Sequence, residues 1–259
     1  LGGRLFDRLG RRIALTPFGH EVLQRARRLV SDADALKQTS KGLHAGLIGT
    51  LRVGLSSAPG ALLSTPLMLH MAEHHPTVQV TVSRGSTELQ LTQLRDRQLD
   101  ALVVDLRRVE AAPDLKIEHV VDMRAGFVCR REHPVLQAHP RGVPFDALLS
   151  YPIASIQLSQ EVARLLVDHY GPQANPAQMT TLQCEDIASL LDVVGQTDAV
   201  YLGIVGAARE GLAQGRLVEL GMHTPLKGQA RLGLITLAGR TELPIMSVFR
   251  AFIQKHLTD

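Results

Sequence analysis

The stretch TLRVGLSSAPGALLSTPLMLHMAEHHPTVQVTVSRGSTELQLTQLRDRQLDALVVD (residues 50–105) decides the fold class of this chain. Residues 50–55 read as a strand, and Val78, Val80 and Val82 alternate with polar residues, which marks a second strand. Residues 99–104 are a largely apolar run, typical of a strand buried on both faces of a parallel sheet. We therefore expect three strands in this stretch.

Two helices are expected between these strands. Thr65 and Pro66 are the residue types of a helix N-cap and first helical position, so the first helix would begin there and end before Pro76. Residues 86–97 predict the second helix, with Thr87 and Gln90 at the spacing of a capping box. The order strand, helix, strand, helix, strand predicts a doubly wound α/β domain.

A second α/β series follows. Its expected strands cover residues 126–130, 153–156, 181–184, 199–204 and 231–237. Its expected helices cover residues 145–149, 160–170, 185–194 and 244–257, the last with its apolar residues on one face. The chain therefore divides into two α/β halves, and such halves bind ligands in the crevice at the carboxyl ends of their strands.

The residues before the first strand are of a different kind. Residues 11–15 suggest a small strand after a tight turn, and Thr16-Pro17 predicts a helix that runs to about residue 39. Residues 41–49 are rich in glycine and indicate a linker. Apolar residues recur along the helix at spacings of 4, 3, 4 and 3, a heptad seam made by Val22, Ala26, Leu29, Ala33 and Leu36. We favour packing of this seam on a partner helix over packing on its own domain.

Composition excludes several classes of protein. The 259 residues suggest about two domains at roughly 150 residues each. No run approaches the ~20 apolar residues of a membrane helix, and no signal peptide opens the chain. Two cysteines, Cys129 and Cys184, exclude a disulfide scaffold and a four-cysteine zinc site. We expect both to be inert core thiols in a reducing cytoplasm.

Positive charge is concentrated at the front of the chain. Residues 1–30 contain seven arginines against Asp7 and Glu21, whereas the whole chain has a net charge of only +3. A basic segment of this kind indicates a nucleic acid or an anionic surface as partner, with a solvated arginine-rich helix as the plainer alternative. Aromatic residues are only 3% and tryptophan is absent, which argues against a stacking platform for single-stranded nucleic acid.

Residues 1–8 (LGGRLFDR) and 15–19 (LTPFG) carry a specific resemblance, because several fixed residues keep their spacing. They resemble the LysR-type transcriptional regulators, in which an LG-x-x-LF-x-R … LT-x-x-G run follows the recognition helix of a winged helix-turn-helix. Phe18 stands where that family usually has a small residue. Residues 51–54 and 99–101 fit the same family, and residues 200–204 fit it without the second glycine of its V-x-x-G-x-G-I region.

The resemblance implies an α/β fold with two Rossmann-like lobes, similar to a type 2 periplasmic binding protein. Residues 1–16 would be the remnant of a wing, and residues 17–46 a linker and dimerisation helix with a hinge. Residues 50–125 and 224–259 would form lobe I, and residues 126–223 lobe II, with crossings near 124–126 and 220–224. The family's helix-turn-helix would precede residue 1, so we expect this chain to be part of a longer protein.

The function implied by the resemblance is that of a DNA-binding transcriptional regulator and not of an enzyme. It would sense a small organic anion in the cleft between the lobes. The implied partners are this effector, promoter DNA, further copies in a homodimer or homotetramer, and RNA polymerase, without membrane, cofactor or metal, in the cytoplasm. The alternative from another class is a stand-alone solute-binding protein, which needs neither the basic front nor the heptad helix and usually carries an export signal.

Polar residues that follow the strands of the first half are candidates for the effector site. Ser56 and Ser57 offer hydroxyls and backbone amides to a carboxylate, or form a simple turn or helix cap. Gly85 and Ser86 open the next helix, where close backbone approach and the helix N-terminus favour an anion. Arg84 beside them either clamps that anion or points to solvent.

The remaining candidates would complete the cleft. Asp105 ends the buried strand and would receive a ligand donor or pair with an arginine. Ser155 and Gln157 follow one strand of the second half, and Gly203 ends another, where the family's effector-contacting loops lie. Arg124 lies near the expected crossing between the lobes and would sense their closure.

Arg8, Arg11 and Arg12 are the candidate DNA contacts, because a wing would bring them to the phosphate backbone or the minor groove. Contacts of this kind position a protein and read little sequence. We therefore expect this chain alone to bind DNA weakly, without sequence preference and with strong dependence on salt.

Two motifs raise enzymatic alternatives. Residues 70–74 (HMAEH) match the H-x-x-E-H pattern of zinc peptidases, but a catalytic zinc needs a third ligand, and the motif ends a short helix where exposed polar residues are expected. Residues 54–58 (GLSSA) approach the G-x-S-x-G of hydrolases, with Ala58 in place of the last glycine. Both alternatives are weaker than the regulator interpretation.

Overall fold

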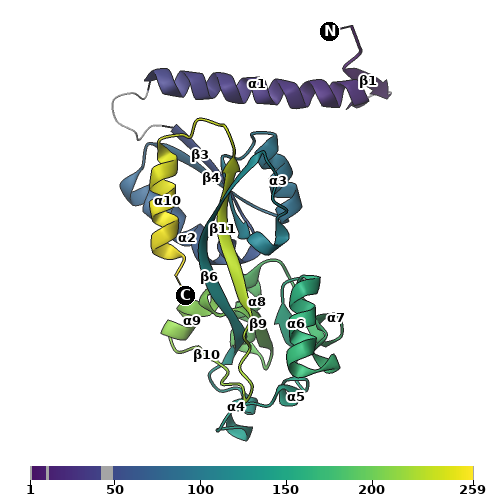
Figure 1. Ribbon diagram of the computed structural model, residues 1–259, viewed down its shortest axis with the longest axis vertical. Coiled ribbons are helices and arrows are strands. Elements are labelled where there is room, and N and C mark those ends of the chain that lie inside the picture. Colours follow the sequence, from purple (N-terminus) through teal and green to yellow (C-terminus); the bar gives the residue numbers. More distant parts are fainter. Residues whose placement is uncertain (1, 10–11, 42–48, 259) are drawn as a thin grey trace.

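The structure is a computed structural model of the chain, and it describes residues 2–9, 12–41 and 49–258. It has three parts: a front end that lies across one end of the molecule, a first half next to it, and a second half at the far end (Figure 1). The first half contains β3, α2, β4, α3, β5, β11 and α10, and the second half contains β7–β10 and α4–α9. Strand β6 runs through both halves.

The front end is a β-hairpin followed by a long helix. Strand β1 (Phe6–Leu9) pairs antiparallel with β2 (Arg12–Leu15), and α1 (Pro17–Lys41) follows. Thr16 caps α1, because its Oγ1 accepts a hydrogen bond from the Gly19 amide at 2.8 Å. A Cβ on Gly19 would lie 2.0 Å from the Leu5 carbonyl oxygen, so only glycine fits where the helix passes the hairpin. The predicted helix start is confirmed.

Helix α1 touches the first half through polar contacts. Gln24 and Arg28 both donate to Asp96 Oδ1, at 2.7 and 3.0 Å, at the C-terminal end of α3. Most of the described part of the predicted seam is uncovered: Leu29 is 70% exposed and Ala26 and Ala33 are also exposed, whereas Val22 is half-buried. The side chain of Leu36 lies outside the described residues. From Ala26 to Ala33 the seam therefore does not pack on its own domain.

The first half of the large sheet has a parallel centre. Strand β3 (Gly49–Leu55) pairs in parallel with β4 (Val78–Arg84) and with β5 (Ala101–Asp105). Strand β11 (Gln229–Leu237) adds to β5 in the antiparallel direction, although it comes from the far end of the sequence. The three predicted strands are therefore confirmed, each within two residues at its ends.

Strand β6 (Leu115–Arg130) joins the two halves. It pairs with β11 up to Arg124 and with β9 (Val200–Ile204) from Ala125 onward. Strand β7 (Ile153–Ser155) then pairs with β9 and with β8 (Thr180–Gln183), and β10 (Leu217–Glu219) pairs with the end of β6. The sequence analysis predicted only residues 126–130 of β6 and missed the alternation of apolar with polar residues over 115–125, which is itself a strand signal.

Helix α2 (Ser57–His74) corrects the sequence analysis. It begins eight residues before the predicted start at Thr65, and it contains Pro66 in its interior. Pro59 lies in its first turn, where a missing amide proton costs nothing. Buried Leu62, Leu63 and Leu67 then fix the helix against the sheet, and this packing outweighs the helix-start signal at Thr65.

Helix α3 (Thr87–Arg95) is present, but the predicted capping box is wrong. Its N-cap is Ser86, whose hydroxyl accepts from the Leu89 amide at 3.3 Å. Gln90 is fully buried and donates to the Leu55 and Ser83 carbonyl oxygens, at 3.2 and 3.1 Å. It therefore ties α3 to β3 and β4 instead of folding back on the helix end.

The other helices cover the two halves. Helix α10 (Ile245–His256) packs beside α2 through buried Phe249, Phe252 and Ile253. In the second half the helices are α4 (Pro134–Ala138), α5 (Phe145–Leu148), α6 (Gln160–Tyr170), α7 (Pro176–Met179), α8 (Ile187–Gln196) and α9 (Arg209–Ala213). In the described part of the chain, no helix is long and apolar enough to cross a membrane.

Candidate functional site

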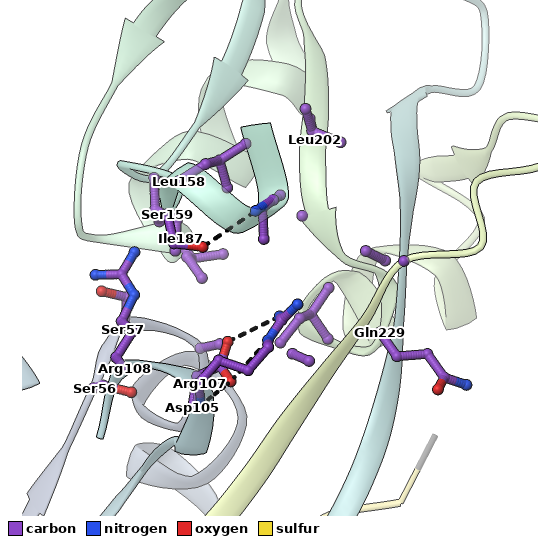
Figure 2. Close-up of a pocket in the computed structure, with 18 of the residues that line it drawn as sticks. Ser56, Ser57, Asp105, Arg107, Arg108, Leu158, Ser159, Ile187, Leu202 and Gln229 are labelled. Carbon is purple, nitrogen blue, oxygen red and sulfur yellow. Dashed lines mark hydrogen bonds and ion pairs between the residues drawn. The ribbon is translucent and has the colours of Figure 1, made fainter. Parts of the chain in front are cut away.

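A cavity of about 110 Å³ lies between the two halves (Figure 2). It opens at the carboxyl ends of β3 and β5, where the chain turns into α2 and into the 3-10 turn Leu106–Arg108. From the other side it is closed by the start of α6, by Ile187 at the start of α8, and by β9. This is the place where α/β sheets bind ligands, because turns and helix N-termini gather there.

The wall made by the first half is polar. Ser56 is the N-cap residue of α2, and its hydroxyl makes no capping bond within the described structure. Ser57 begins the helix, and its hydroxyl donates to a carboxylate oxygen of Glu185 from the second half. The first amides and the dipole of α2 thus face the cavity, which favours an anion.

Two arginines line the same wall. Asp105 Oδ1 accepts from the Arg107 amide and from Arg107 Nε, each at 3.2 Å, and Oδ2 accepts from Nη2 at 3.0 Å. Arg107 is therefore held in place by a fork of charge-assisted bonds. Arg108 donates to the Gln157 carbonyl oxygen across the cleft. The sequence analysis missed both arginines, although two adjacent arginines directly after a buried strand were a visible signal.

The wall made by the second half is mostly apolar. It presents branched aliphatic side chains from α6, from the loop before it and from α8, together with the backbone of β9. Its lining residues are Ile156, Leu158, Ser159, Val162, Leu165, Leu166, Ile187, Tyr201, Leu202, Gly203 and Ile204. Figure 2 shows Leu158, Ser159 and Ile187 facing the polar wall across the cavity. The cavity therefore has two chemically unlike sides.

The structure brings four of the ten predicted effector residues to the cavity: Ser56, Ser57, Asp105 and Gly203. A Cβ on Gly203 would lie 2.2 Å from the Tyr201 hydroxyl, so glycine is needed where β9 borders the site. Asp105 pairs with Arg107. The sequence left open whether Asp105 would receive a ligand donor or pair with an arginine.

The other six predicted residues do not line the cavity. Ser155 is fully buried and donates to the Leu202 carbonyl oxygen at 2.8 Å. Gln157 borders the cleft with its backbone carbonyl oxygen, which accepts a hydrogen bond from Arg108. Arg124 pairs with Glu219, with Nη2 at 2.8 Å from Oε2. Ser86 caps α3 beside Gly85.

Arg84, the sixth of these residues, closes the rim of the cleft. It donates to Asp186 Oδ1 at 2.8 Å and lies 3.5 Å from the Glu185 carbonyl oxygen, so it links β4 to the start of α8. A Cβ on Gly60 would lie 2.9 Å from Arg84 Nε, which shows how closely the guanidinium passes the first turn of α2. The Ser189 hydroxyl and Arg84 together lower the pKa of Asp186 from its ordinary value.

The residues behind the enzymatic alternatives lie elsewhere or have other partners. His70 and His74 are at the C-terminal end of α2, the end opposite to the cavity. Within the described residues, no group of three His, Cys, Asp or Glu side chains is arranged to hold a metal ion. Ser57 pairs with Glu185 and not with a histidine. Within the described residues, neither motif has the partners that a zinc peptidase site or a serine triad needs.

The cysteines differ from each other. Cys129 is fully buried on β6, and burial raises the pKa of its thiol to about 12, so it is inert as expected. Cys184 is exposed, and its sulfur accepts from the Asp186 amide at 3.4 Å; the expectation of a core thiol is wrong for this residue. Among the candidate DNA contacts, Arg11 and the side chains of Arg8 and Arg12 lie outside the described residues.

Comparison with known proteins finds matches that cover most of the chain. The LysR substrate-binding domain model matches residues 44–258. The chain is 30% identical over 254 residues to the SDS degradation transcriptional activation protein of a Pseudomonas species, which covers 98% of this chain and 82% of that protein. It is 31% identical over 239 residues to a probable hydrogen peroxide-inducible genes activator of Mycobacterium avium, covering 91% of this chain and 74% of that one.

Solved structures share the fold. CrgA, a LysR-type transcriptional regulator from Neisseria meningitidis, is similar with a TM-score of 0.66 and 17% identity, covering 100% of this chain and 85% of that chain. The probable transcriptional regulator PA0477 from Pseudomonas aeruginosa is similar with a TM-score of 0.67 and 17% identity, covering 95% and 80%. At this level of identity the likeness shows the arrangement of the elements and not the ligand.

Proposed function

Because this chain belongs to the LysR-type transcriptional regulators, we propose that its cavity is an effector site for a small amphiphilic anion. The anionic group would lie on the polar wall, and a short apolar tail on the wall opposite. Binding would change how the two halves stand relative to each other. That change can be no larger than the difference in the ligand's affinity for the two arrangements.

The proposal divides the chain into four parts. Residues 1–16 are the remnant of the DNA-binding wing, and residues 17–46 are the linker and dimerisation helix with its hinge. Residues 50–125 and 224–259 form effector lobe I, and residues 126–223 form lobe II. The change in pairing partner of β6 after Arg124 supports the first crossing between the lobes.

The observation that carries the proposal is the contrast between the two walls of one cavity. Arg107, Arg108 and the first turn of α2 supply cations, hydroxyls and amides on one side. Leu158, Val162 and their neighbours supply aliphatic surface on the other. A purely polar ligand would leave the aliphatic wall in contact with water, and a purely apolar one would leave the arginines and amides unpaired.

Arg108 and the first amides of α2 favour an anionic head group on the polar wall. Asp105 neutralises Arg107, and the Glu185 carboxylate accepts from the Ser57 hydroxyl, whereas the described contact of Arg108 is with a carbonyl oxygen. The first turn of α2 adds positive potential from its amides. One relative is an activator named for SDS degradation, and dodecyl sulfate is an anion with an aliphatic tail, which makes alkyl sulfates a suitable probe of this class.

The size of the cavity limits the tail. A volume of about 110 Å³ is below the roughly 300–1,000 Å³ of sites for drug-sized ligands. The cleft as described therefore fits a head group with a short alkyl chain, and a longer ligand requires the halves to move apart. Such an opening would break contacts that cross the cleft, which include those of Ser57 with Glu185, of Arg84 with Asp186 and of Arg108 with the Gln157 carbonyl oxygen.

Helix α1 and the basic front end would serve assembly and DNA binding. Helix α1 presents an exposed, heptad-spaced seam to a second copy of the chain, in a homodimer or homotetramer. The basic front end lies on promoter DNA, and RNA polymerase is a further partner, in the cytoplasm. Catalysis has no part in this function.

Calorimetric titration of the full chain with butyl, hexyl and octyl sulfate below their micelle concentrations tests the effector class. Hexanol and inorganic sulfate are the matched controls, because each presents one half of the ligand. We expect one site, with affinity rising with chain length by at most about fourfold per methylene, the value for roughly 0.8 kcal/mol per buried CH₂, and by less once a longer chain has to open the cleft. Equal affinity for hexanol and hexyl sulfate, or no dependence on chain length, would contradict the proposal.

A further inference from the structure

Tyr201 differs from its neighbours on the apolar wall of the effector cavity. It lies on β9, lines the cavity and is 1% exposed. It carries the only aromatic ring among the described residues that line the cavity. Its side chain belongs to the same buried cluster as Ala58 and Ile187, which line the cavity from the starts of α2 and α8. A tyrosine in this position brings a hydroxyl to a surface that is otherwise mostly aliphatic.

The hydroxyl of Tyr201 lies over Gly203. A Cβ on Gly203 would be 2.2 Å from Tyr201 Oη and 2.5 Å from Cζ, so the ring extends along β9 toward the carboxyl end of the strand. Side chains two residues apart on a strand share one face, which is why the two residues meet. That end of β9 borders the cavity through Gly203 and Ile204. The ring therefore carries its hydroxyl to the part of the strand that faces the ligand site.

The hydroxyl has a proton to donate. Burial raises the pKa of Tyr201, and a hydrogen bond from the Ile204 amide offsets part of this effect, so the phenol stays protonated at neutral pH. An amide N–H can only donate, so the phenol oxygen accepts in that bond and keeps its own proton for another partner. Within the described residues, Tyr201 donates this proton to no protein acceptor.

A bare alkyl chain is a poor neighbour for such a group. It would displace water from the cavity and leave the phenol proton without an acceptor, which costs free energy. An oxygen atom in the chain would accept the proton and remove that cost. A site built around a hydrogen-bonding group discriminates against an analogue that lacks the matching atom more strongly than an apolar pocket discriminates between chain lengths.

We propose that Tyr201 is a specificity-determining residue, whose hydroxyl donates to an acceptor oxygen in the tail of the effector. The preferred ligands are then small organic anions whose short chain carries an ether, hydroxyl or carbonyl oxygen. This inference rests on the effector site proposed above and narrows the class of ligand that the site selects.

Calorimetry on the full chain tests the donor with hexyl sulfate and three isomeric ether sulfates. These are 2-propoxyethyl, 3-ethoxypropyl and 4-methoxybutyl sulfate, in which an oxygen replaces one methylene of the hexyl chain at successive positions. Tyr201→Phe removes only the hydroxyl. We expect it to weaken the binding of at least one ether sulfate by about threefold to tenfold, which is what one neutral hydrogen bond contributes, and not to weaken the binding of hexyl sulfate.

A second measurement needs no variant. The three ether sulfates have the same composition and differ only in where the oxygen lies, so a donor at one fixed place should make their affinities for the parent chain differ by several-fold. Equal affinities of the three isomers would overturn the inference. Tyr151→Phe is the matched control, because Tyr151 is half-buried in the second half, does not line the cavity and should leave all four affinities unchanged.

The outcomes separate this inference from the proposed function. If hexyl sulfate binds to the parent chain but Tyr201→Phe weakens all four sulfates equally, or weakens none of them, the inference fails and the effector site stands. If none of the four sulfates binds to the parent chain, the proposed function fails and the inference fails with it.

Discussion

The two walls of the cavity differ in composition and in what holds them in place. The wall from the first half is made of strand ends and helix starts, and its polar groups are fixed by hydrogen bonds, such as the fork between Asp105 and Arg107. The wall from the second half is made of side chains that continue a buried cluster, in which Leu166 is 1% exposed. One wall is therefore positioned by electrostatics and the other by packing.

This difference teaches where selectivity and affinity come from. Fixed polar groups reject a ligand that cannot pair with them, because a buried donor left unpaired costs about 1–3 kcal/mol. Apolar surface discriminates less sharply and adds free energy with each buried methylene. The polar wall should therefore select the class of head group, and the apolar wall should set how tightly members of that class bind.

The largest effect is expected from a charge on the apolar wall. Leu158→Asp removes a tail contact and places a carboxylate opposite the anion, and we expect it to weaken octyl sulfate binding by about a hundredfold. Calorimetry measures this loss. Leu149→Asp is the control, because Leu149 is 39% exposed and does not line the cavity. Similar losses of octyl sulfate affinity in both variants would show that the apolar wall does not bind the alkyl tail.

A smaller effect is expected from the polar wall. Arg108→Gln removes one cation from this wall. We expect about tenfold weaker binding of hexyl sulfate and no change for hexanol, because a hydrogen bond from a cation to an anion is stronger than a hydrogen bond between neutral groups. Arg131→Gln, an exposed arginine outside the cavity, should change neither affinity. If Arg108→Gln weakened hexanol as much as hexyl sulfate, the head group would not lie on this wall.

Removing the contact between Ser57 and Glu185, which joins the two walls, should strengthen ligand binding instead of weakening it. The Glu185 carboxylate holds the Ser57 hydroxyl and would repel an incoming anion. Glu185→Gln should therefore raise affinity for hexyl sulfate, by about two- to fivefold given the small energies of exposed charges. Glu132→Gln, also exposed in the second half, is the control. A weaker affinity in Glu185→Gln would make this carboxylate part of the binding site instead of a competitor.

The smallest effect is expected from pH. The pKa of Asp186 is lowered by Ser189 and Arg84, so its contribution to stability is present above the ordinary value of 3.8 and is lost as the pH falls below it. Both side chains of the Arg84–Asp186 pair are well exposed, so the contribution is small. The difference in free energy of unfolding between the parent chain and Asp186→Asn, measured with urea, should be larger at pH 6 than at pH 3. A difference that persists unchanged at pH 3 would contradict this origin.

The sequence predicted the fold better than it predicted the site, and the reasons are local. Strands β3 and β5 have the apolar runs that burial requires, so short-range pattern was sufficient. Helix α2 was placed too late because Thr65-Pro66 imitates a helix start, while burial of Leu62 and Leu63, which is a tertiary effect, keeps the helix continuous.

The candidate site depends on contacts that no local pattern contains. Ser56 and Ser57 were found because they directly follow a strand. The partner of Ser57 is Glu185, which is 128 residues away in the sequence. Similarly, Arg84 was expected near the ligand but pairs with Asp186 at the rim. The apolar wall was missed because its leucines look like ordinary core residues until α6 is placed opposite α2.

The most direct test of the account is a crystal structure of the full chain with hexyl sulfate bound. We predict that the sulfate oxygens lie within hydrogen-bond distance of the Ser57 hydroxyl and the Arg108 guanidinium, and that the alkyl chain lies against Leu158 and Leu166. A ligand bound in the reverse orientation, or bound outside the cavity, would contradict the division of the site into a polar and an apolar wall.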